Sequence, residues 1–416
     1  MDSSEKTSSL TPVIDADWSY LHADLHIHIG SAGGKAVKIT ASRSLDLMSI
    51  LYQDAPRKGL DVVGVVDAGS TLVSAEMEDM LAAGDLVELP GGGFMARNQV
   101  LLIAACEVES REGVHLLSYL PDLQSLKRWQ KYFKTRVSNQ QLSTQRVAAG
   151  VRDIILLSLE LGGIFCPAHA FTPHKGIYGV WTDRLAREIG ADFDHIKVLE
   201  LGLSADSEMA DRLEETSRFT YLSNSDAHSA LNVGREFNRL QMKAKNFSEL
   251  RLCLENRAGR RVVANYGLDP RLGKYHRSFC PLCSTISADE APVLGCSSCG
   301  NSHMVMGVYD RIVAIQDHQS ARHPEGRPPY YYRLPLKDLP GIGPRTYLKL
   351  IQAFPGEIEL MEKAGIEDIS RVGGAKAAAA IRDMRLGRLR ITPGGGGKYG
   401  RVTRHPAGRP GRETGN

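Results

Sequence analysis

Short apolar runs alternate with helix-like segments over roughly the first 270 residues. The runs cover residues 60–66 (LDVVGVV), 101–105 (LLIAA), 163–166 (GIFC), 196–199 (IKVL) and 220–222 (TYL). Segments with a helical pattern lie at 44–59, 145–162 and 183–190. Apolar strands that alternate with helices are typical of a parallel sheet covered by helices. The pattern therefore predicts the α/β class.

Residues that can bind metals stand at the ends of these runs. In the run 24–28 (DLHIH), alternate side chains share one face of a strand, so Asp24, His26 and His28 point the same way. Taken alone, this run fits a half-exposed strand with surface histidines equally well. Further candidates follow later runs, namely Asp67, Glu107, His169, Glu200, Asp226 and His228, and His115 opens another. Because the carboxyl ends of barrel strands form one rim, a polynuclear metal site is the better interpretation.

The residue types indicate which metals and which chemistry to expect. Imidazole nitrogens with carboxylate oxygens suit Zn²⁺ or Mn²⁺, whereas Mg²⁺ prefers oxygen ligands alone. Two cations about 3.5–4 Å apart can polarise a phosphate and acidify a shared water. Glu107 is the predicted bridging carboxylate, and Asp226 is the predicted ligand that orients the hydroxide; with Asp67 they are the predicted catalytic residues. Asp24 and Glu200 are expected to hold imidazole N–H groups.

DLHIH and SNSDAH resemble the metal-binding motifs of the PHP (polymerase and histidinol phosphatase) superfamily. The resemblance covers about residues 20–270 and implies a distorted seven-stranded (β/α) barrel that hydrolyses phosphate esters with two or three cations. It assigns the ligand role to His26, His28, Asp67, Glu107, His115, His169, Asp226 and His228. Ala68 stands where many members have His, which leaves a third cation one ligand short. His174 could replace that ligand, but a supporting role is the expectation.

Four cysteines have the spacing of a zinc ribbon: Cys280, Cys283, Cys296 and Cys299. Two Cys-x2-Cys pairs present thiolates tetrahedrally to Zn²⁺, and the alternatives are two disulfides or free thiols. The sequence shows no signal peptide or membrane-spanning run, so we expect the reducing cytoplasm, no membrane association and a structural zinc ion. Cys106, Cys166 and Cys253 are expected to be buried apolar residues.

A Gly-Ile-Gly segment near the C-terminus is typical of a helix-hairpin-helix element. Gly341 and Gly343 precede a helical stretch that includes Arg345. Glycines let a backbone approach DNA, and helix-start amides bind phosphate. An ordinary turn is the alternative, and a second, degenerate copy is predicted at 369–376.

Two further segments carry aromatic and basic residues. Phe171, Lys175 and Tyr178 follow a predicted ligand and could stack on or contact DNA, with packing against a neighbouring loop as the equal alternative. Residues 126–137 (LKRWQKYFKTRV) mix basic and aromatic residues, for which an amphipathic helix with a solvated basic face is favoured over a nucleic-acid grip.

Length and charge bear on the number of domains and on the partner of the protein. A chain of 416 residues predicts two or three domains. The net charge of +3 does not indicate a nucleic-acid partner, but residues 384–416 hold eight Lys or Arg and one acid. The predicted units are a disordered N-terminus (1–19), the metal-binding barrel (20–272), the zinc ribbon (273–310), a linker (311–332), the helix-hairpin-helix region (333–390) and a flexible basic tail (391–416).

The order barrel, ribbon and hairpin resembles the endonuclease Q family, most clearly in HAFTPHKGIYG, LELGLSAD, SNSDAHS and GREFNRL. The resemblance implies DNA repair by cleavage on the 5′ side of a deaminated base (uracil, hypoxanthine or xanthine) or an abasic site. DNA with damaged bases is then the partner, and a replication or repair protein is a candidate second one. The residues alone reach only metal-dependent phosphodiester hydrolysis on DNA. The alternatives are a phosphoesterase acting on a small monoester of the histidinol-phosphate type and a DNA-binding scaffold with a vestigial metal site.

Overall fold

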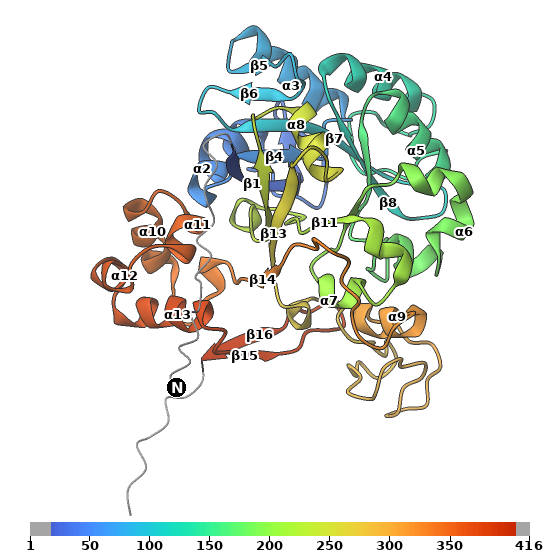
Figure 1. Ribbon diagram of the computed structural model, residues 1–416, viewed down its shortest axis with the longest axis vertical. Coiled ribbons are helices and arrows are strands. Elements are labelled where there is room, and N and C mark those ends of the chain that lie inside the picture. Colours follow the sequence, from blue (N-terminus) through green and yellow to red (C-terminus); the bar gives the residue numbers. More distant parts are fainter. Residues whose placement is uncertain (1–17, 405–416) are drawn as a thin grey trace, which may run out of the picture.

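A computed structural model describes residues 18–404, so the predicted disordered N-terminus lies almost entirely outside the described residues, as does the end of the predicted tail. A ten-stranded mixed sheet forms the centre of the molecule (Figure 1). Its parallel middle consists of β1 (Ser19–Ile27), β4 (Val62–Val65) and β7 (Leu101–Glu109). Apolar runs are continuous here because both faces are buried: Val63 and Leu102 pack on one side of the sheet, and Val62 and Leu101 on the other.

The outer strands are mostly antiparallel, which corrects the expectation of a parallel sheet. Next to β7 run β8 (His115–Leu120) and then β9 (Ile164–Pro167). The connection 110–114 is too short for a parallel crossover, so β8 must turn back along β7. Beyond β1 lie β12 (Phe237–Met242), β13 (Arg261–Gly267) and β14 (Tyr330–Tyr332), and beyond β7 lie β6 (Phe94–Ala96) and β5 (Leu86–Glu88).

A second sheet of two parallel strands, β10 (Val198–Glu200) and β11 (Thr220–Leu222), lies beside the first, with β10 in contact with β9 and β11 in contact with β13. The segment after β11 returns to β1, where the His28 amide donates to the Ala227 carbonyl at 3.0 Å. The ends of β1, β7, β9, β10 and β11 therefore meet on one side of the molecule. Since β10 and β11 form a sheet of their own, the seven-stranded barrel stays a prediction.

Helices cover the sheets and occupy the segments with a helical pattern. The predicted helix at 44–59 is divided into α1 (Leu47–Ser49), a π-helical turn (Ile50–Asp54) and α2 (Ala55–Lys58). The other helices of this part are α3 (Thr71–Ala82), α4 (Leu123–Phe133), α5 (Val151–Glu160), α6 (Leu185–Ile189), α7 (Ser207–Ala210) and α8 (Phe247–Leu254). In α4, Trp129 and Phe133 are buried and the basic residues face outward, as an amphipathic helix requires. A small hairpin of β2 (Ser31–Ala32) and β3 (Lys35–Ala36) lies beside the sheet.

The cysteine segment has little regular structure and is followed by α9 (Val308–Ile315). The range predicted as a linker, 311–332, contains the end of α9 and also β14, which adds to the central sheet beside β13. This range therefore packs on the barrel region. Among residues 18–404, no helix combines the length and apolarity that crossing a lipid bilayer requires.

Four helices near the C-terminus form a separate group with its own apolar core (Figure 1, orange to red). They are α10 (Pro344–Ala353), α11 (Glu357–Glu362), α12 (Ile366–Gly373) and α13 (Ala375–Arg385). Lys58 of α2 fixes the group to the sheet domain, because its Nζ lies 2.7 Å from Glu357 Oε2 and both side chains are buried.

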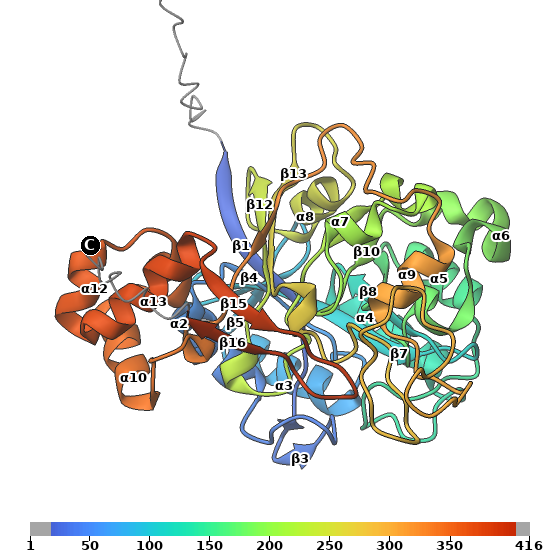
Figure 2. The same ribbon diagram turned by 90° about the horizontal axis from the view of Figure 1, so that it is seen from below.

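A hairpin of β15 (Leu389–Thr392) and β16 (Arg401–Arg404) begins at the end of the predicted helix-hairpin-helix region and runs into the predicted flexible tail (Figure 2). Its loop packs on residues 271–274, where Gly394 N donates to Arg271 O and Gly400 N to Leu272 O. The first half of the predicted tail is therefore held against the body of the protein.

Candidate metal centre

Two imidazoles and a carboxylate from opposite ends of the domain meet at the rim. His26 and His28 come from the end of β1, and Asp226 comes from the segment after β11. Asp226 Oδ1 lies 3.5 Å from His26 Nε2 and 3.4 Å from His28 Nε2. Asp226 has φ +45°, a left-handed conformation that costs a non-glycine residue energy and is found most often at functional sites. We call these three residues the first triad.

The tautomers of both histidines are set by carboxylates behind them. His26 Nδ1 lies 2.8 Å from Glu200 Oε2, and His28 Nδ1 lies 3.0 Å from Asp67 Oδ1. Because a carboxylate only accepts, each Nδ1 is the donor and each neutral ring presents the lone pair of Nε2 to the centre. The two Nε2 atoms face each other at 3.3 Å. Two facing lone pairs repel unless a cation lies between them, so this arrangement suits a bound metal.

A second triad consists of Glu107, His115 and His169, at the ends of β7, β8 and β9. Glu107 Oε1 lies 3.0 Å from His115 Nδ1 and 3.7 Å from His169 Nε2. His169 Nδ1 lies 3.0 Å from the hydroxyl of Thr172, which itself donates to the His169 carbonyl, so the ring donates to Thr172 and Nε2 faces the centre. His169 also has a positive φ of +29°. Each triad offers three ligand atoms within 4.8 Å of one another.

Glu107 connects the two triads. Its Oε1 lies 3.6 Å from His26 Nε2, and its Oε2 lies 3.5 Å from His28 Nε2. The side chain is buried, and although His115 Nδ1 lies 3.0 Å away, no donor among the described residues is aligned for a hydrogen bond to Oε1. A buried carboxylate oxygen without a donor is costly, whereas a cation beside it would satisfy it. The residues present therefore fit a two-cation centre with Glu107 in the bridging position.

The electrostatics of the centre favour positive charge. Burial alone would raise the pKa of Glu107, but the nearby imidazoles and Lys38 hold it well below its usual range. Asp226 behaves in the same way beside His26 and His28. Burial would lower the pKa of His26, yet the carboxylates of Glu200, Asp226 and Glu107 raise it to about 10. The same carboxylates would attract a divalent cation in place of a proton.

Asp67 and His228 lie beside the triads. Asp67 accepts hydrogen bonds from His28 Nδ1, from the Ile29 amide at 2.5 Å and from the Ser143 hydroxyl. It therefore holds a ligand here, which differs from its expected place among the ligands. The ring centroid of His228 lies 4.4 Å from that of His28, and its Nδ1 contacts the Asp226 carbonyl at 3.0 Å.

Among the expected supporting residues, only Glu200 contacts an imidazole. Asp24 shares the strand face with His26, but its oxygens accept from the backbone amides of Ser225 and Gly234. His174 packs edge-on against Tyr275 and is not among the residues that line the cavity beside the triads. It therefore neither holds a ligand nor replaces the one that is missing at Ala68.

The predicted DNA contacts in the loop after β9 require a correction. The rings of Phe171 and Tyr178 are fully buried and stack on each other with centroids 5.4 Å apart. They cannot stack on a base, so packing within the protein is what the structure shows. Lys175 is partly exposed and pairs with Glu109 at 2.7 Å.

The predicted hairpin glycines lie just before α10, in the C-terminal helix group that Figure 1 shows at the side of the sheet domain. Gly341 (φ +92°), Gly343 and Arg345 are exposed just before and at the start of α10. A Cβ on Gly341 would lie 3.9 Å from that of Lys376 at the start of α13. The two glycine turns are therefore neighbours.

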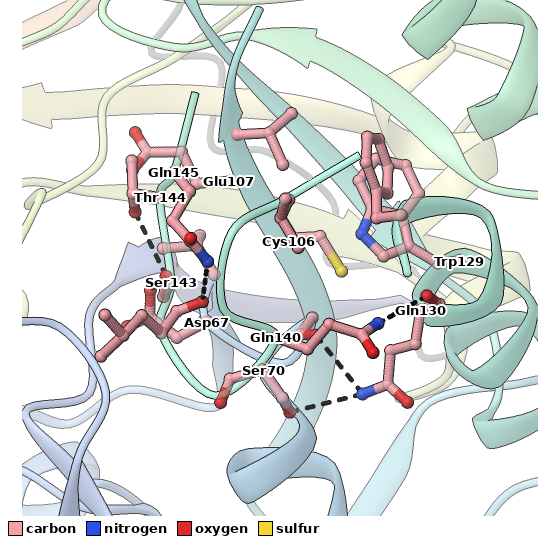
Figure 3. A pocket seen from close by; sticks show the side chains of 16 residues that line it. Asp67, Ser70, Cys106, Glu107, Trp129, Gln130, Gln140, Ser143, Thr144 and Gln145 are labelled. Carbon is pink, nitrogen blue, oxygen red and sulfur yellow. Dashed lines mark hydrogen bonds between the residues drawn. The ribbon is translucent and has the colours of Figure 1, made fainter. Parts of the chain in front are cut away.

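Sequence reasoning missed two residues that touch the triads, Thr144 and Lys38, and a third, Ser143, that touches Asp67. The Thr144 hydroxyl donates to Glu107 Oε2 at 2.8 Å, and Lys38 Nζ lies 3.3 Å from the same oxygen. Figure 3 shows the segment with Ser143 and Thr144 passing over Asp67 and Glu107. These residues come from irregular loops without a motif, so the sequence offers no signal for them. With five of the six triad residues, all except His26, they line an open cavity of about 450 Å³.

The four cysteines of the predicted ribbon also converge. Cys280 Sγ lies 3.7 Å from Cys299 Sγ, and Cys283 Sγ lies 3.5 Å from Cys296 Sγ. Hydrogen bonds from the Asn301 side chain and the Cys283 backbone lower the pKa of Cys280 to about 6, which favours the thiolate that metals bind. Cys106, Cys166 and Cys253 are buried elsewhere in the core.

Comparison with known proteins places the chain in a family. No family model matches it. An uncharacterised protein of Bacillus subtilis, YqxK, is 38% identical over 389 residues, which make up 92% of this chain and 99% of that protein. The crystal structure of PfuEndoQ, a lesion-specific endonuclease from Pyrococcus furiosus, has a TM-score of 0.80 at 33% identity and covers 93% of this chain and 96% of that one. The chain belongs to the endonuclease Q family.

A second endonuclease Q structure gives the same similarity. It is a complex with a 27-mer duplex that carries an abasic lesion at the active site, and it matches with a TM-score of 0.80 and 33% identity over 93% of this chain and 97% of that one. As a member of the endonuclease Q family, the chain is a nuclease and thus a hydrolase.

Proposed function

We infer that this protein is a metal-dependent DNA-repair endonuclease that hydrolyses the phosphodiester on the 5′ side of a damaged nucleotide. The observation that carries the proposal is the meeting of two ligand triads at the buried Glu107 carboxylate. The endonuclease Q relative with an abasic duplex supports an abasic site as one substrate. Deaminated bases (uracil, hypoxanthine and xanthine) are the further substrates that we propose from the family resemblance.

The residues of the centre have distinct proposed roles. The first triad would hold one cation and the second triad another, with Glu107 between them. Bound cations supply Lewis-acid polarisation of the phosphate and an acidified water. Glu200 and Asp67 keep the Nε2 atoms of the two β1 histidines directed at the centre. The nitrogen-rich donor set favours Zn²⁺ or Mn²⁺, with Mg²⁺ as the alternative.

Lys38 and Asp226 suit the phosphodiester itself. Lys38 Nζ lies beside Glu107 and lines the open cavity, so its charge can turn to a non-bridging phosphate oxygen. The Asp226 side chain is 30% exposed, while those of His26 and His28 are buried, so it is the most exposed member of the first triad. We assign it the orientation of the attacking hydroxide.

We propose roles in binding DNA and in stabilising the fold for the glycine turns and the four cysteines. We propose that the strands around the centre correspond to the seven-stranded PHP barrel and that the four cysteines bind a structural Zn²⁺. The exposed, adjacent glycine turns before α10 and α13 are proposed as paired helix-hairpin-helix elements. Their backbone amides would grip phosphates, with charge from Arg345 and Lys376 and without reading the base sequence.

One assay tests the proposal. Duplexes with a single central uracil or abasic site, labelled at both ends, are incubated with the protein and Mn²⁺ or Mg²⁺. A single nick 5′ of the lesion is expected, and it should disappear in Asp226→Ala. Asp79→Ala, which removes an exposed carboxylate on α3, is the matched control and should cut normally.

The alternatives give different results in the same assay. Release of phosphate from small monoesters with the duplex intact would indicate a small-molecule phosphoesterase. Binding of the duplex without cutting, unchanged in Asp226→Ala, would indicate a scaffold with a vestigial site. Either result would overturn the proposed function.

A further inference from the structure

Arg235 joins the backbone of the first triad to the C-terminal hairpin. It lies just before β12, in the GREFNRL segment. Its Nε donates to the Ser225 carbonyl at 2.8 Å, and its Nη2 donates to the Asp226 carbonyl at 3.4 Å. Its Nη1 lies 3.0 Å from the hydroxyl of Tyr399, in the loop between β15 and β16. One guanidinium thus contacts the triad segment and a residue more than 160 positions away.

The position of Arg235 is fixed by the buried carboxylate of Asp24. One oxygen of Asp24 accepts from the Ser225 amide at 3.1 Å, and the other accepts from the Gly234 amide at 2.9 Å. Gly234 has φ +65°, so the chain turns sharply just before Arg235. Asp24 therefore holds two segments side by side, and the guanidinium bridges them on the Asp226 side.

The conformation of Asp226 is the feature that needs such support. A left-handed aspartate persists only where its surroundings determine it. Ser225 is held at its amide by Asp24, but the two carbonyls at 225 and 226 face outward to Arg235. The planar guanidinium of an arginine carries N–H donors on three nitrogens, so it can bind two carbonyls and a hydroxyl that lie on different sides of it. A lysine has all its donors on one nitrogen and cannot reach all three groups in this way.

We propose that Arg235 is a positioning residue for cation binding, and that Tyr399 of the C-terminal hairpin orients its guanidinium. Arg235 keeps the Asp226 carboxylate turned toward His26 and His28 by holding the backbone behind it. The Tyr399 hydroxyl contacts Nη1 and so fixes the orientation of the guanidinium. In this way the C-terminal hairpin contributes to the metal centre without touching a ligand. This inference rests on the proposed role of Asp226 as a metal ligand.

Tyr399 is well placed for that task. The ring is 42% exposed, and Lys274 Nζ lies 4.8 Å from its centroid on the segment that holds the hairpin loop. Gly397 N donates to the Lys274 carbonyl and Gly400 N to the Leu272 carbonyl, so the loop on both sides of Tyr399 is anchored. Removal of the hydroxyl alone leaves these contacts in place.

The test measures cation affinity without DNA. Full-length protein, with its cysteine site loaded with zinc, is stripped of other metals and titrated with Mn²⁺, and free Mn²⁺ is followed by its electron paramagnetic resonance signal. Mn²⁺ avoids thiolate sites, so the signal reports the imidazole–carboxylate centre. Arg235→Lys keeps the positive charge but loses the planar guanidinium, and Tyr399→Phe loses only one hydroxyl. Arg239→Lys is the control, because Arg239 lies four residues further on, within β12, and faces Tyr20.

Arg235→Lys is expected to weaken the tighter Mn²⁺ site by about 10- to 100-fold, the usual effect of removing a supporting contact behind a ligand. Tyr399→Phe should weaken it by roughly two- to tenfold. Arg239→Lys should bind Mn²⁺ as the wild type does. Excess Mn²⁺ should restore kcat in Arg235→Lys with the KM for DNA unchanged, which a general folding defect would not allow.

The proposal is overturned if Arg235→Lys and Tyr399→Phe bind Mn²⁺ with wild-type affinity, or if the Arg239 control loses as much. If Arg235→Lys does not fold, Tyr399→Phe decides alone. Failure of the proposed function would look different, since the wild type would then bind Mn²⁺ and leave lesion duplexes uncut.

Discussion

Gly202 lies directly behind the second triad, and an alanine there should remove one cation. A Cβ added to Gly202 would lie 2.7 Å from His169 Cβ and 3.0 Å from His169 Cα. Ordinary contact begins near 3.4 Å, so His169 must move by about 0.7 Å (3.4 − 2.7) or the Gly202 segment must give way. Metal–ligand distances tolerate only about 0.2 Å.

Displacement of His169 should affect the second triad and leave the first triad intact. The wild type should bind two Mn²⁺ and Gly202→Ala only one, because the first triad does not contact Gly202. Cleavage of a lesion duplex should fall by about 100-fold or more, the usual cost of misplacing a catalytic group by about 1 Å. The alanine also adopts φ +76° at a cost of about 1–2 kcal/mol in the free energy of unfolding.

Gly326→Ala separates the backbone cost from the collision. Gly326 has φ +79°, and a Cβ there would meet no atom within 4 Å. It should lose similar stability and keep both cations and full cleavage. Mn²⁺ stoichiometry, nicking rate and urea unfolding are measured for both variants. If Gly202→Ala retains two cations and normal nicking, the assignment of His169 to the second triad is wrong.

Three further predictions concern other parts of the chain. Burial raises the pKa of Glu236 to about 8, so its contribution to stability is complete below pH 4.5 and is lost as the pH rises to 8, at up to about 1.4 kcal/mol per pH unit. Glu236→Gln should remove this decline in the free energy of unfolding, measured by urea unfolding at pH 5, 7 and 9. Lys58→Met leaves the buried Glu357 without a counter-charge and should cost about 3–5 kcal/mol in chemical denaturation. Lys58→Met combined with Glu357→Leu should recover most of that loss, and equal losses in both variants would contradict a buried ion pair. Cys296→Ser should lower the zinc content by one ion per chain, whereas Cys253→Ser should not, and unchanged zinc in the former would refute the cysteine site.

The triads could be predicted because they depend on regular structure. His26 and His28 share a strand face by simple alternation, and Glu107 and His169 follow apolar runs that end at the same rim. The β7–β8 hairpin could also have been found, because residues 110–114 are too few for a helical crossover and include Gly113 at φ +84°.

The rest depends on tertiary contacts that the pattern does not contain. Asp24 satisfies the alternation, yet two loop amides take its oxygens, and only the folded chain brings Ser225 and Gly234 beside it. Phe171 and Tyr178 look the same in sequence whether they stack on a base or on each other. Lys38 reaches Glu107 from an irregular loop whose path no periodicity reports.

The two sets of proposed metal ligands differ in how far apart they lie along the chain. Cys280 and Cys299 enclose a short segment, so the cysteine site can close early, at small entropic cost. His26 and Asp226 stand 200 positions apart and meet only after β11 has returned to β1. Metal loading should therefore follow a fixed order during folding, with zinc entering the cysteine site first. The nuclease centre, which could damage nucleic acid, should bind its cations and become active only when the whole domain has folded.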